Sequence, residues 1–460
     1  MITQLLITEV INKQRQFFYT GATRDVSFRI AQLKNLKQGI MEYESEISEA
    51  LKADLNKPEF EVYGAEFSLI FTEIADAIKH LNNWVKPQRK KLEFTFLPGS
   101  AYLYPEPLGV ALIIGPWNYP FQLSLLPLVG AIAAGNCAIV KPSEIASHTS
   151  QVIHKVISKI FPREYIAVVE GGVETTQELL QEKFDHIFFT GGTAVGKIIM
   201  KEAAKHLTPV TLELGGKSPC IVDTDINVEV SARRITWGKF LNAGQTCIAP
   251  DYLLVHKSIK HDLLNAIADS IKEFYGTRPI DSPDYARIIS QKHYTRLVNY
   301  IQGDIYLGGE CNSDKLFIAP TVINNVSWQD SIMEEEIFGP ILPVIEYEDI
   351  NEVITAINSR PKPLALYLFT NNKNLQARIL RETSSGGVGI NDTIKHCGVA
   401  TLPFGGVGDS GIGKYHGKAS FDVFSHYKSV LKRGFAFDMK VLYPPYAGKL
   451  PLLKKLFGKN

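Results

Sequence analysis

Three side chains in this sequence could take part in nucleophilic chemistry: the thiol of Cys247, the carboxyl of Glu213 and the amide of Asn118. Cys247 follows a predicted helix in the small, polar segment NAGQTCIAP, a setting typical of an accessible thiol nucleophile. Glu213 lies in a strand-like run just before two glycines, where a carboxylate could act as a general base. Asn118 stands between two prolines in GPWNYPF, and its amide could donate a hydrogen bond to a developing oxyanion.

Each of these residues also has a plain structural explanation. A cysteine is most often buried and inert, Glu213 could end a strand in solvent, and Asn118 could cap its turn. Cys137 and Cys220 lie in apolar, strand-like sequence, so we expect them to be core thiols. These alternatives stay open as long as the residues are considered one by one.

A fourth candidate is the glycine-rich segment HIFFTGGTAVGK, where a strand meets Gly191 and Gly192 and a helix follows. Main-chain N–H groups at such a helix start bind phosphate. The segment nearly matches the triphosphate loop G-x-x-x-x-G-K-[ST], but Ile198 stands where a hydroxyl should bind magnesium. The glycines at 191, 192 and 196 do not form G-x-G-x-x-G either, and a turn for close strand and helix packing explains them equally well.

Two further kinds of site are excluded by the sequence. GDSG at 408–411 resembles a serine nucleophile motif, but G-x-S-x-G is not satisfied and no motif marks partner residues. No cluster of His, Cys, Asp and Glu has metal-ligand spacing, so we expect no metal.

The elements that must position these residues follow from the apolar pattern. Residues 5–85 have helical spacing and end before Pro87, which predicts a helical layer that covers a sheet. Residues 92–104 alternate around Pro98-Gly99 and predict a hairpin that projects as an arm. From residue 108 strands and helices alternate, which predicts a doubly wound parallel sheet, and a second α/β domain is expected from about residue 210.

Composition narrows the class of protein. The chain has 460 residues, enough for two or three domains, and its 49 basic and 48 acidic residues give a net charge of +1. No overall field attracts a polyanion, so we expect no nucleic-acid partner. Five widely spaced cysteines fit a reducing compartment, and the N-terminus lacks the pattern of an export signal. Residues 107–140 carry no charge, but their prolines and polar residues favour a buried strand and helix over a membrane span.

Taken together, the motifs resemble the aldehyde dehydrogenase superfamily over residues 20–445, with features of its class 3 branch, which includes fatty aldehyde dehydrogenases and usually forms dimers. The resemblance is carried by GPWNYP at 115–120, KPSE at 141–144, FTGGTAVG at 189–196, LELGGKSP at 212–219, GQTC at 244–247, EEIFGP at 335–340 and PFGGVGDSGIGKYHG at 403–417. The short N-terminus, YHGKASFDVFSH at 415–426 and a late Tyr-Pro-Pro point to class 3.

The resemblance implies an α/β fold with three parts: a Rossmann-like dinucleotide-binding domain (1–85 and 105–209), an α/β catalytic domain (210–415) and a small β oligomerisation arm (86–104 and 416–445). Residues 446–460 would form a basic amphipathic tail. It also implies that Cys247 is the nucleophile, Glu213 the base, and Asn118 with the Cys247 N–H the oxyanion hole. We therefore expect oxidation of an aldehyde to a carboxylic acid through a thioacyl enzyme.

The implied cofactor is NAD, with NADP as the alternative that the class 3 branch also uses. Glu144 would disfavour a 2′-phosphate by charge repulsion. The residues that the resemblance places at the cofactor are Trp117, Lys141, Ser143, Glu144, Gly191, Gly192, Gly196, Leu214, Gly215, Glu336 and Phe338.

The substrate is expected to be an apolar aldehyde of medium or long chain, against a wall of Tyr63, Tyr119, Trp237 and Phe404. The tail KLPLLKKLFGKN has four lysines and apolar residues near helical spacing. It could lie on an anionic membrane, cover the substrate mouth or fray. We expect a cytoplasmic homodimer, with the tail as its candidate for peripheral membrane contact.

Three alternatives to a hydrolytic aldehyde dehydrogenase remain. A CoA-acylating enzyme needs no strong water-activating base, so Glu213 counts against it. A nucleoside triphosphatase is disfavoured by Ile198. A non-catalytic binding protein that retains the fold is disfavoured by the presence of Cys247, Glu213 and Asn118.

Overall fold

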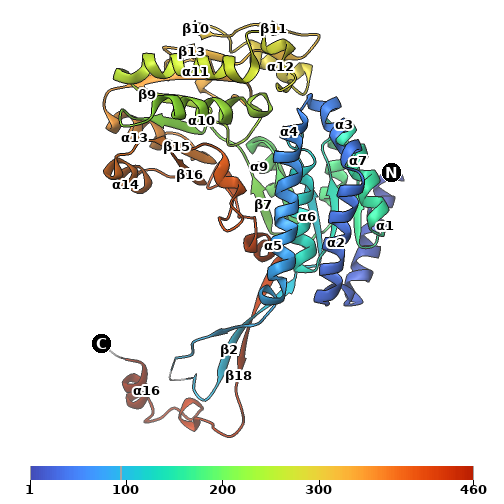
Figure 1. Cartoon of the computed structure of the whole chain (residues 1–460). Coiled ribbons are helices and arrows are strands. Elements are labelled where there is room, and N and C mark those ends of the chain that lie inside the picture. Colours follow the sequence, from blue (N-terminus) through green and yellow to red (C-terminus); the bar gives the residue numbers. More distant parts are fainter. Residues whose placement is uncertain (1, 94–95, 459–460) are drawn as a thin grey trace.

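The computed structural model describes residues 2–93 and 96–458 and consists of two α/β units and a projecting arm (Figure 1). The first unit is built on a six-stranded sheet in the order β17-β7-β6-β3-β4-β5. All of its neighbours pair in parallel except β17, which is antiparallel to β7. The strands are β3 (Val110–Ile114), β4 (Cys137–Lys141), β5 (Ile166–Val168), β6 (His186–Thr190), β7 (Val210–Glu213) and β17 (Gly411–Ile412).

Helices cover this sheet, as the apolar spacing predicts. In α2 the side chains of Leu33, Leu36 and Ile40 are fully buried on one face. Every residue of α6 is buried, so the uncharged run 107–140 is a buried strand, helix and strand, as expected. The helices are α1 (Ile2–Tyr19), α2 (Val26–Glu42), α3 (Glu44–Leu55), α4 (Glu59–Glu61), the π-helix η2 (Val62–Phe67), α5 (Ser68–Trp84), α6 (Gln122–Ala134), α7 (Ser147–Ile160), α8 (Val173–Gln181) and α9 (Thr193–Ala204).

The second unit is built on a seven-stranded sheet in the order β10-β13-β14-β9-β8-β15-β16. Its strands are β8 (Pro219–Val222), β9 (Tyr252–His256), β10 (Asp304–Leu307), β13 (Thr321–Asn324), β14 (Ile341–Tyr347), β15 (Ala365–Phe369) and β16 (Gly387–Ile390), with β11 (Cys311–Asn312) and β12 (Phe317–Ile318) as a separate pair. Its helices are α10 (Val228–Phe240), α11 (Lys260–Tyr275), α12 (Gln291–Val298), α13 (Ile350–Asn358) and α14 (Lys373–Glu382).

The two units meet around the glycine-rich segment after residue 402. Each unit has its own hydrophobic core, and Phe404 packs against both cores. The change from the first sheet to the second falls between Glu213 and Pro219, because β7 pairs with β6. The first sheet thus extends beyond the boundary that the sequence predicts at residue 210.

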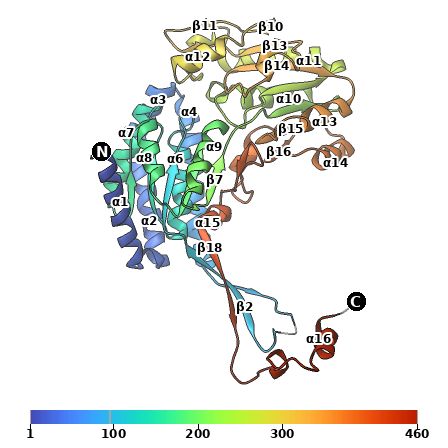
Figure 2. The same ribbon diagram turned by 180° about the vertical axis from the view of Figure 1, so that it is seen from behind.

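The arm is a three-stranded antiparallel sheet in the order β1-β2-β18, which extends away from both units (Figures 1 and 2). Its strands are β1 (Gln88–Lys90), β2 (Ser100–Pro107) and β18 (Ser425–Lys432). The predicted hairpin is therefore present with its first strand earlier than residue 92, while residues 94 and 95 lie outside the described residues. Residues 418–423 form α15 (Lys418–Val423), which packs on the first unit through the rings of Phe421 and Trp84 at 5.7 Å.

The tail contains α16 (Leu450–Phe457), which lies beside the end of the arm and away from both sheets (Figures 1 and 2). The side chains of Leu456 and Phe457, and residues 459 and 460, lie outside the described residues. Within the described part of the chain, no helix has both the length and the apolar character needed to cross a membrane.

Candidate active site

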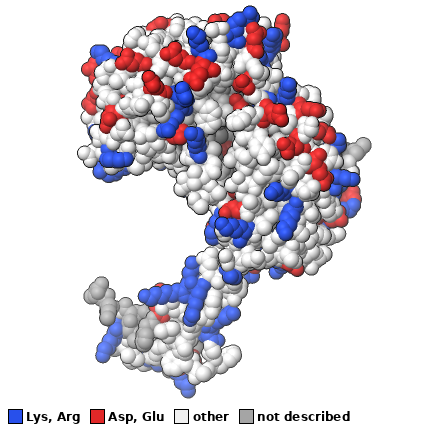
Figure 3. Space-filling model, viewed as in Figure 1, with Lys and Arg blue, Asp and Glu red and all other residues white. Residues whose placement is uncertain are grey.

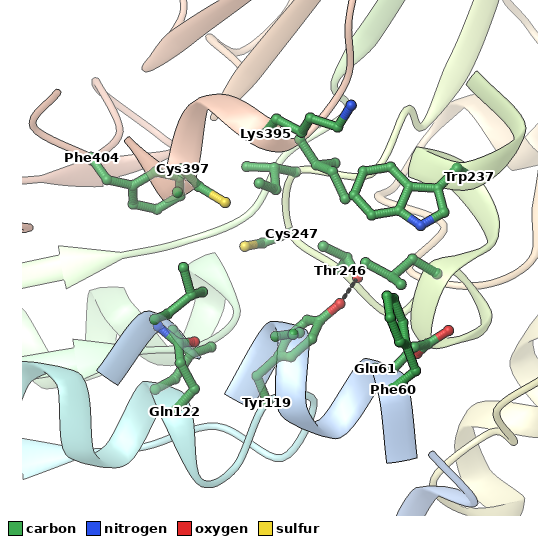
Figure 4. Close-up of a pocket in the computed structure, with 18 of the residues that line it drawn as sticks. Phe60, Glu61, Tyr119, Gln122, Trp237, Thr246, Cys247, Lys395, Cys397 and Phe404 are labelled. Atoms are coloured by element: carbon green, nitrogen blue, oxygen red, sulfur yellow. Dashed lines mark hydrogen bonds between the residues drawn. The ribbon is translucent and has the colours of Figure 1, made fainter. Parts of the chain in front are cut away.

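Two cavities lie between the α/β units, and Cys247 lines both of them. The first, here called the apolar cavity, has a volume of about 720 Å³, and the second, the polar cavity, of about 600 Å³. Leu123, Phe404 and Tyr415 also belong to both walls. Figure 4 shows the apolar cavity, with the Cys247 side chain directed into it and Tyr119 and Trp237 on its wall. The Cys247 thiol thus stands where a ligand in one cavity would face a ligand in the other.

Cys247 is presented by a tight turn at the end of α10. The 3₁₀ turn Leu241–Gly244 has three successive residues with positive φ: Asn242 at 51°, Ala243 at 51° and Gly244 at 72°. Asn242 and Ala243 are not glycine, and residues other than glycine rarely adopt the left-handed region because it costs them energy. A Cβ on Gly244 would lie 2.2 Å from the main-chain oxygen of Gly339, so this residue must be glycine.

Asn118 follows β3 and is 3% exposed. Its side-chain Nδ2 donates a hydrogen bond to the main-chain oxygen of Gln245 at 3.0 Å. Its own main-chain oxygen accepts hydrogen bonds from Lys57 Nζ at 2.8 Å and Asn242 Nδ2 at 2.9 Å. An amide group carries two hydrogens, so one of them is left to donate into the polar cavity, which Asn118 lines.

Glu213 is the last residue of β7 and is 2% exposed. Both carboxyl oxygens are buried and have no hydrogen-bond partner among the described residues. Burial raises the pKa of Glu213 well above its ordinary value of 4.5. A carboxyl group with a raised pKa is, once ionised, a stronger base toward water than an ordinary carboxylate.

Acidic neighbours also act on Cys247 itself. Burial raises the pKa of the Cys247 thiol, and the carboxyls of Glu336 and Glu213 raise it further. The pKa of Glu336 is itself raised to about 8, mainly by burial. Attack by Cys247 therefore requires a thiol of raised pKa to lose its proton.

The polar cavity reaches the start of α9, where main-chain N–H groups could bind a phosphate. Gly192 is the N-cap of this helix, and its side-chain position faces open space, so the first N–H groups of the helix are accessible. A Cβ on Gly215 would lie 2.1 Å from a carboxyl oxygen of Glu336, which shows how closely the cavity wall packs. Seven of the predicted cofactor residues line this cavity: Trp117, Gly191, Gly192, Leu214, Gly215, Glu336 and Phe338.

The other four predicted cofactor residues do not line the polar cavity. Lys141, Ser143 and Glu144 lie at and after the carboxyl end of β4, on the far side of β3 from the cavity. Lys141 Nζ and Glu144 form an ion pair at 2.7 Å. Gly196 lies one turn into α9, where a Cβ would lie 2.7 Å from Leu214, so this glycine permits close packing of the helix against the strand.

The expected apolar wall is present with one exception. Tyr119, Trp237 and Phe404 line the apolar cavity, but Tyr63 does not and is 53% exposed, because it points outward from the π-helix η2. Its place is taken by residues that the sequence does not single out: Phe60, Phe274 and Cys397. These residues come from three distant segments, and no local motif marks them. Cys137 and Cys220 are fully buried, as expected for core thiols.

Ser410 of the GDSG segment is fully buried, and its hydroxyl bonds the main chain of Val407. It stabilises a turn, in keeping with its exclusion as a nucleophile.

Comparison with known proteins gives a consistent result. The model of the aldehyde dehydrogenase family matches residues 3–430. The chain is 48% identical to the 4,4'-diaponeurosporen-aldehyde dehydrogenase of Staphylococcus aureus, over 98% of this chain and 99% of the relative. It is 49% identical to aldehyde dehydrogenase family 3 member A2 of Rattus norvegicus (95% and 90%) and 47% identical to the dimeric NADP-preferring aldehyde dehydrogenase of Mus musculus (97% and 99%). The solved structure of a substrate-bound state of Staphylococcus aureus AldH superposes with a TM-score of 0.96, at 48% identity over 98% of this chain and 99% of that one.

Proposed function

The chain belongs to the aldehyde dehydrogenase family, and from this premise we propose that Cys247, Glu213 and Asn118 carry out its reaction. The protein is an enzyme that oxidises aldehydes with NAD or NADP. The observation that carries the proposal is the position of Cys247 on the walls of both cavities, with Asn118 and Glu213 on the polar side.

In the first half of the reaction, Cys247 attacks the aldehyde. The thiol first loses its proton to water, and the thiolate sulfur then bonds to the carbonyl carbon while the carbonyl oxygen becomes an alkoxide. The free hydrogen of the Asn118 amide and the N–H of Cys247 donate to this oxygen, which lowers the energy of the tetrahedral state. A nicotinamide bound in the polar cavity supplies the hydride acceptor. Loss of hydride leaves an acyl group on the Cys247 sulfur.

In the second half, Glu213 acts on water. The ionised carboxylate takes a proton as the water oxygen bonds to the acyl carbon, and the carbon–sulfur bond then breaks. Glu213 then returns its proton to the leaving sulfur, so the products are a carboxylic acid and the free thiol, and Glu213 is again a carboxylate. We propose hydrolysis and not transfer to CoA, because the Glu213 carboxyl has no hydrogen-bond partner among the described residues and can activate water once it ionises.

For the cofactor, we propose that a dinucleotide lies along the edge formed by the carboxyl ends of β6, β3 and β4. Residues of the polar cavity would hold the nicotinamide half and the phosphates. Lys141, Ser143 and Glu144 would then hold the adenosine half at the end of β4, which explains their absence from the cavity wall. We propose a preference for NAD, since the Glu144 carboxylate repels a 2′-phosphate.

For the substrate, we propose an apolar aldehyde of medium or long chain. The apolar cavity is large enough for an extended chain, and Tyr119, Trp237 and Phe404 give it an aromatic wall. Each methylene buried there adds about 0.8 kcal/mol, or roughly fourfold in kcat/KM.

For partners and location, we propose a cytoplasmic homodimer that forms through the arm. The five free cysteines support a reducing compartment. Lys and Arg side chains gather along the face of the arm that Figure 3 shows, and Leu452 and Leu453 of α16 are 48% and 38% exposed. These exposed leucines beside Lys454 and Lys455 support peripheral contact with an anionic membrane.

The test is formation of NADH and NADPH by the purified protein with unbranched aldehydes of increasing chain length, with Cys247→Ala as the control. We expect turnover that rises with chain length and is lost in the control. Equal turnover for short and long aldehydes would contradict the proposed substrate class, and turnover by Cys247→Ala would contradict the proposed nucleophile.

A further inference from the structure

Lys57 is a fully buried lysine close to the active site, and the mechanism above does not use it. Its side chain lies in the loop between α3 and α4 and is 0% exposed. An ammonium group has three N–H donors. They have three partners: the carboxyl of Glu66, the main-chain oxygen of Asn118 at 2.8 Å and the ring face of Tyr119 at 4.0 Å.

Glu66 extends the same contacts to the next helix. It lies in the π-helix η2, a wide helical turn of a kind often found at functional sites. While Glu66 Oε1 accepts from Lys57, Oε2 accepts from the main-chain N–H of Gln122 at 2.8 Å, at the first residue of α6. The ion pair therefore holds the segment from Asn118 to Gln122 at both of its ends.

This segment is in turn bonded to the turn that presents Cys247. The Asn118 amide donates to the main-chain oxygen of Gln245, and the Tyr119 hydroxyl bonds Thr246 Oγ1 at 2.7 Å (Figure 4). Lys57 is thus connected through Asn118 to Gln245 and through Tyr119 to Thr246. Gln245 and Thr246 are the two residues that precede Cys247.

We infer that the buried ion pair of Lys57 and Glu66 positions the oxyanion site, by fixing the main chain of Asn118 so that the Asn118 amide faces the carbonyl attacked by Cys247. This inference rests on the proposed roles of Asn118 and Cys247. Lys57 is a positioning residue, because it contacts neither cavity and acts through Asn118.

Stability alone does not account for such a pair. Two charges lose their hydration on burial, and an apolar pair of similar volume is often as stable or more so, whereas removal of one partner is costly. A Lys57→Met/Glu66→Leu double variant therefore separates the two roles. It keeps the site filled and neutral but removes the hydrogen bonds to Asn118 and Gln122.

The experiment compares two rates in the full-length double variant. The first is the burst of NAD(P)H in a single turnover, which depends on the oxyanion donors. The second is the rate at which iodoacetamide alkylates Cys247, a reaction in which no oxyanion forms. We expect a thermal midpoint close to wild type, an unchanged alkylation rate and a burst slower by about 10- to 100-fold, since small misplacements of reacting groups cost this much.

A folded double variant with a burst rate within twofold of wild type would overturn the inference, and so would a proportional loss of both rates. If the double variant does not fold, Lys57→Met alone gives the same comparison, because it removes the same hydrogen bond to the main-chain oxygen of Asn118. Arg29→Met is the matched control: it removes a buried cation that donates to the main-chain oxygens of Thr23 and Ala133, and should leave the burst unchanged. Failure of the proposed function is distinguishable, because Asn118→Ala would then keep a normal burst.

Discussion

The side-chain amide of Asn118 donates a hydrogen bond to the main-chain oxygen of Gln245 across the boundary between the two α/β units, at 3.0 Å. Asn118 follows a strand of the first sheet, and Gln245 stands two residues before Cys247 in the second unit. The bond therefore holds the Asn118 amide of the first unit close to the segment of the second unit that carries the Cys247 thiol. If Asn118 and Cys247 have the roles proposed above, catalysis depends on how the two units are positioned relative to one another as well as on the residues themselves.

Asn118→Ala should lower kcat by about 100- to 1000-fold, because it removes one preorganised donor to the oxyanion. The affinity for NAD should change little, since the main chain of residue 118 keeps its bonds to Lys57 and Asn242. Stopped-flow NADH formation and equilibrium binding of NAD measure the two effects. A loss of NAD affinity that matches the loss of kcat would contradict the assigned role.

Cys247 should be the residue that reacts with an aldehyde-mimicking alkylating agent. Cys247 lines both cavities, whereas Cys137 and Cys220 are fully buried. Mass mapping after limited iodoacetamide treatment should find the label on Cys247 in proportion to lost activity. Cys311 is exposed and serves as the internal control, because its labelling should leave activity unchanged. Inactivation that follows labelling of Cys311 or Cys397 would contradict the proposal.

Activity should rise with pH above neutrality. Burial raises the pKa of Glu213, so the folded enzyme holds the neutral acid at pH values where a free carboxyl is ionised. The base that hydrolyses the thioacyl enzyme appears only as pH rises through this raised pKa, and the thiol of Cys247 ionises in the same direction. The same raised pKa affects stability: Glu213 contributes to the free energy of unfolding at low pH, and this contribution is lost as pH rises through the pKa of the folded state. A steady-state rate that falls from pH 7 to pH 9, with the protein folded, would be the contrary result.

Glu144→Gln should improve the use of NADP. The change removes the charge that repels a 2′-phosphate while the ion pair with Lys141 is lost, which frees an ammonium group for the phosphate. We expect kcat/KM for NADP to rise at least tenfold relative to that for NAD. Glu164→Gln, an exposed change before β5 in the same sheet, is the control. An unchanged NADP/NAD ratio would place the adenosine ribose elsewhere.

Much of the fold could be predicted from the sequence, because its elements are marked by local pattern. The helices α6 and α7 and the strands β8 and β9 lie in the region from residue 108 onward where strands and helices are predicted to alternate, since glycine, proline and apolar spacing mark their ends. The end of the first unit could not be predicted, because only strand pairing assigns Val210–Glu213 to the first sheet.

The candidate site divides in the same way. Cys247, Glu213 and Asn118 stand in motifs, so their sequence neighbours mark them. Lys57, Phe60 and Cys397 reach the site only through the packing of distant segments, and nothing around them in the sequence indicates a cavity. Tyr63 was expected on the cavity wall, but the wide turn of η2 points it outward, and a helix of this type has no clear sequence signal.

The central claim is that the acyl group of the substrate is carried by Cys247 and released by Glu213. It is tested most directly by intact and peptide mass measurement of Glu213→Gln after mixing with NAD and a long-chain aldehyde. The account predicts a normal burst of NADH, a steady-state rate lower by about 100-fold or more, and an acyl adduct that accumulates on Cys247. Rapid steady-state turnover by Glu213→Gln, or an adduct on any other residue, would contradict it.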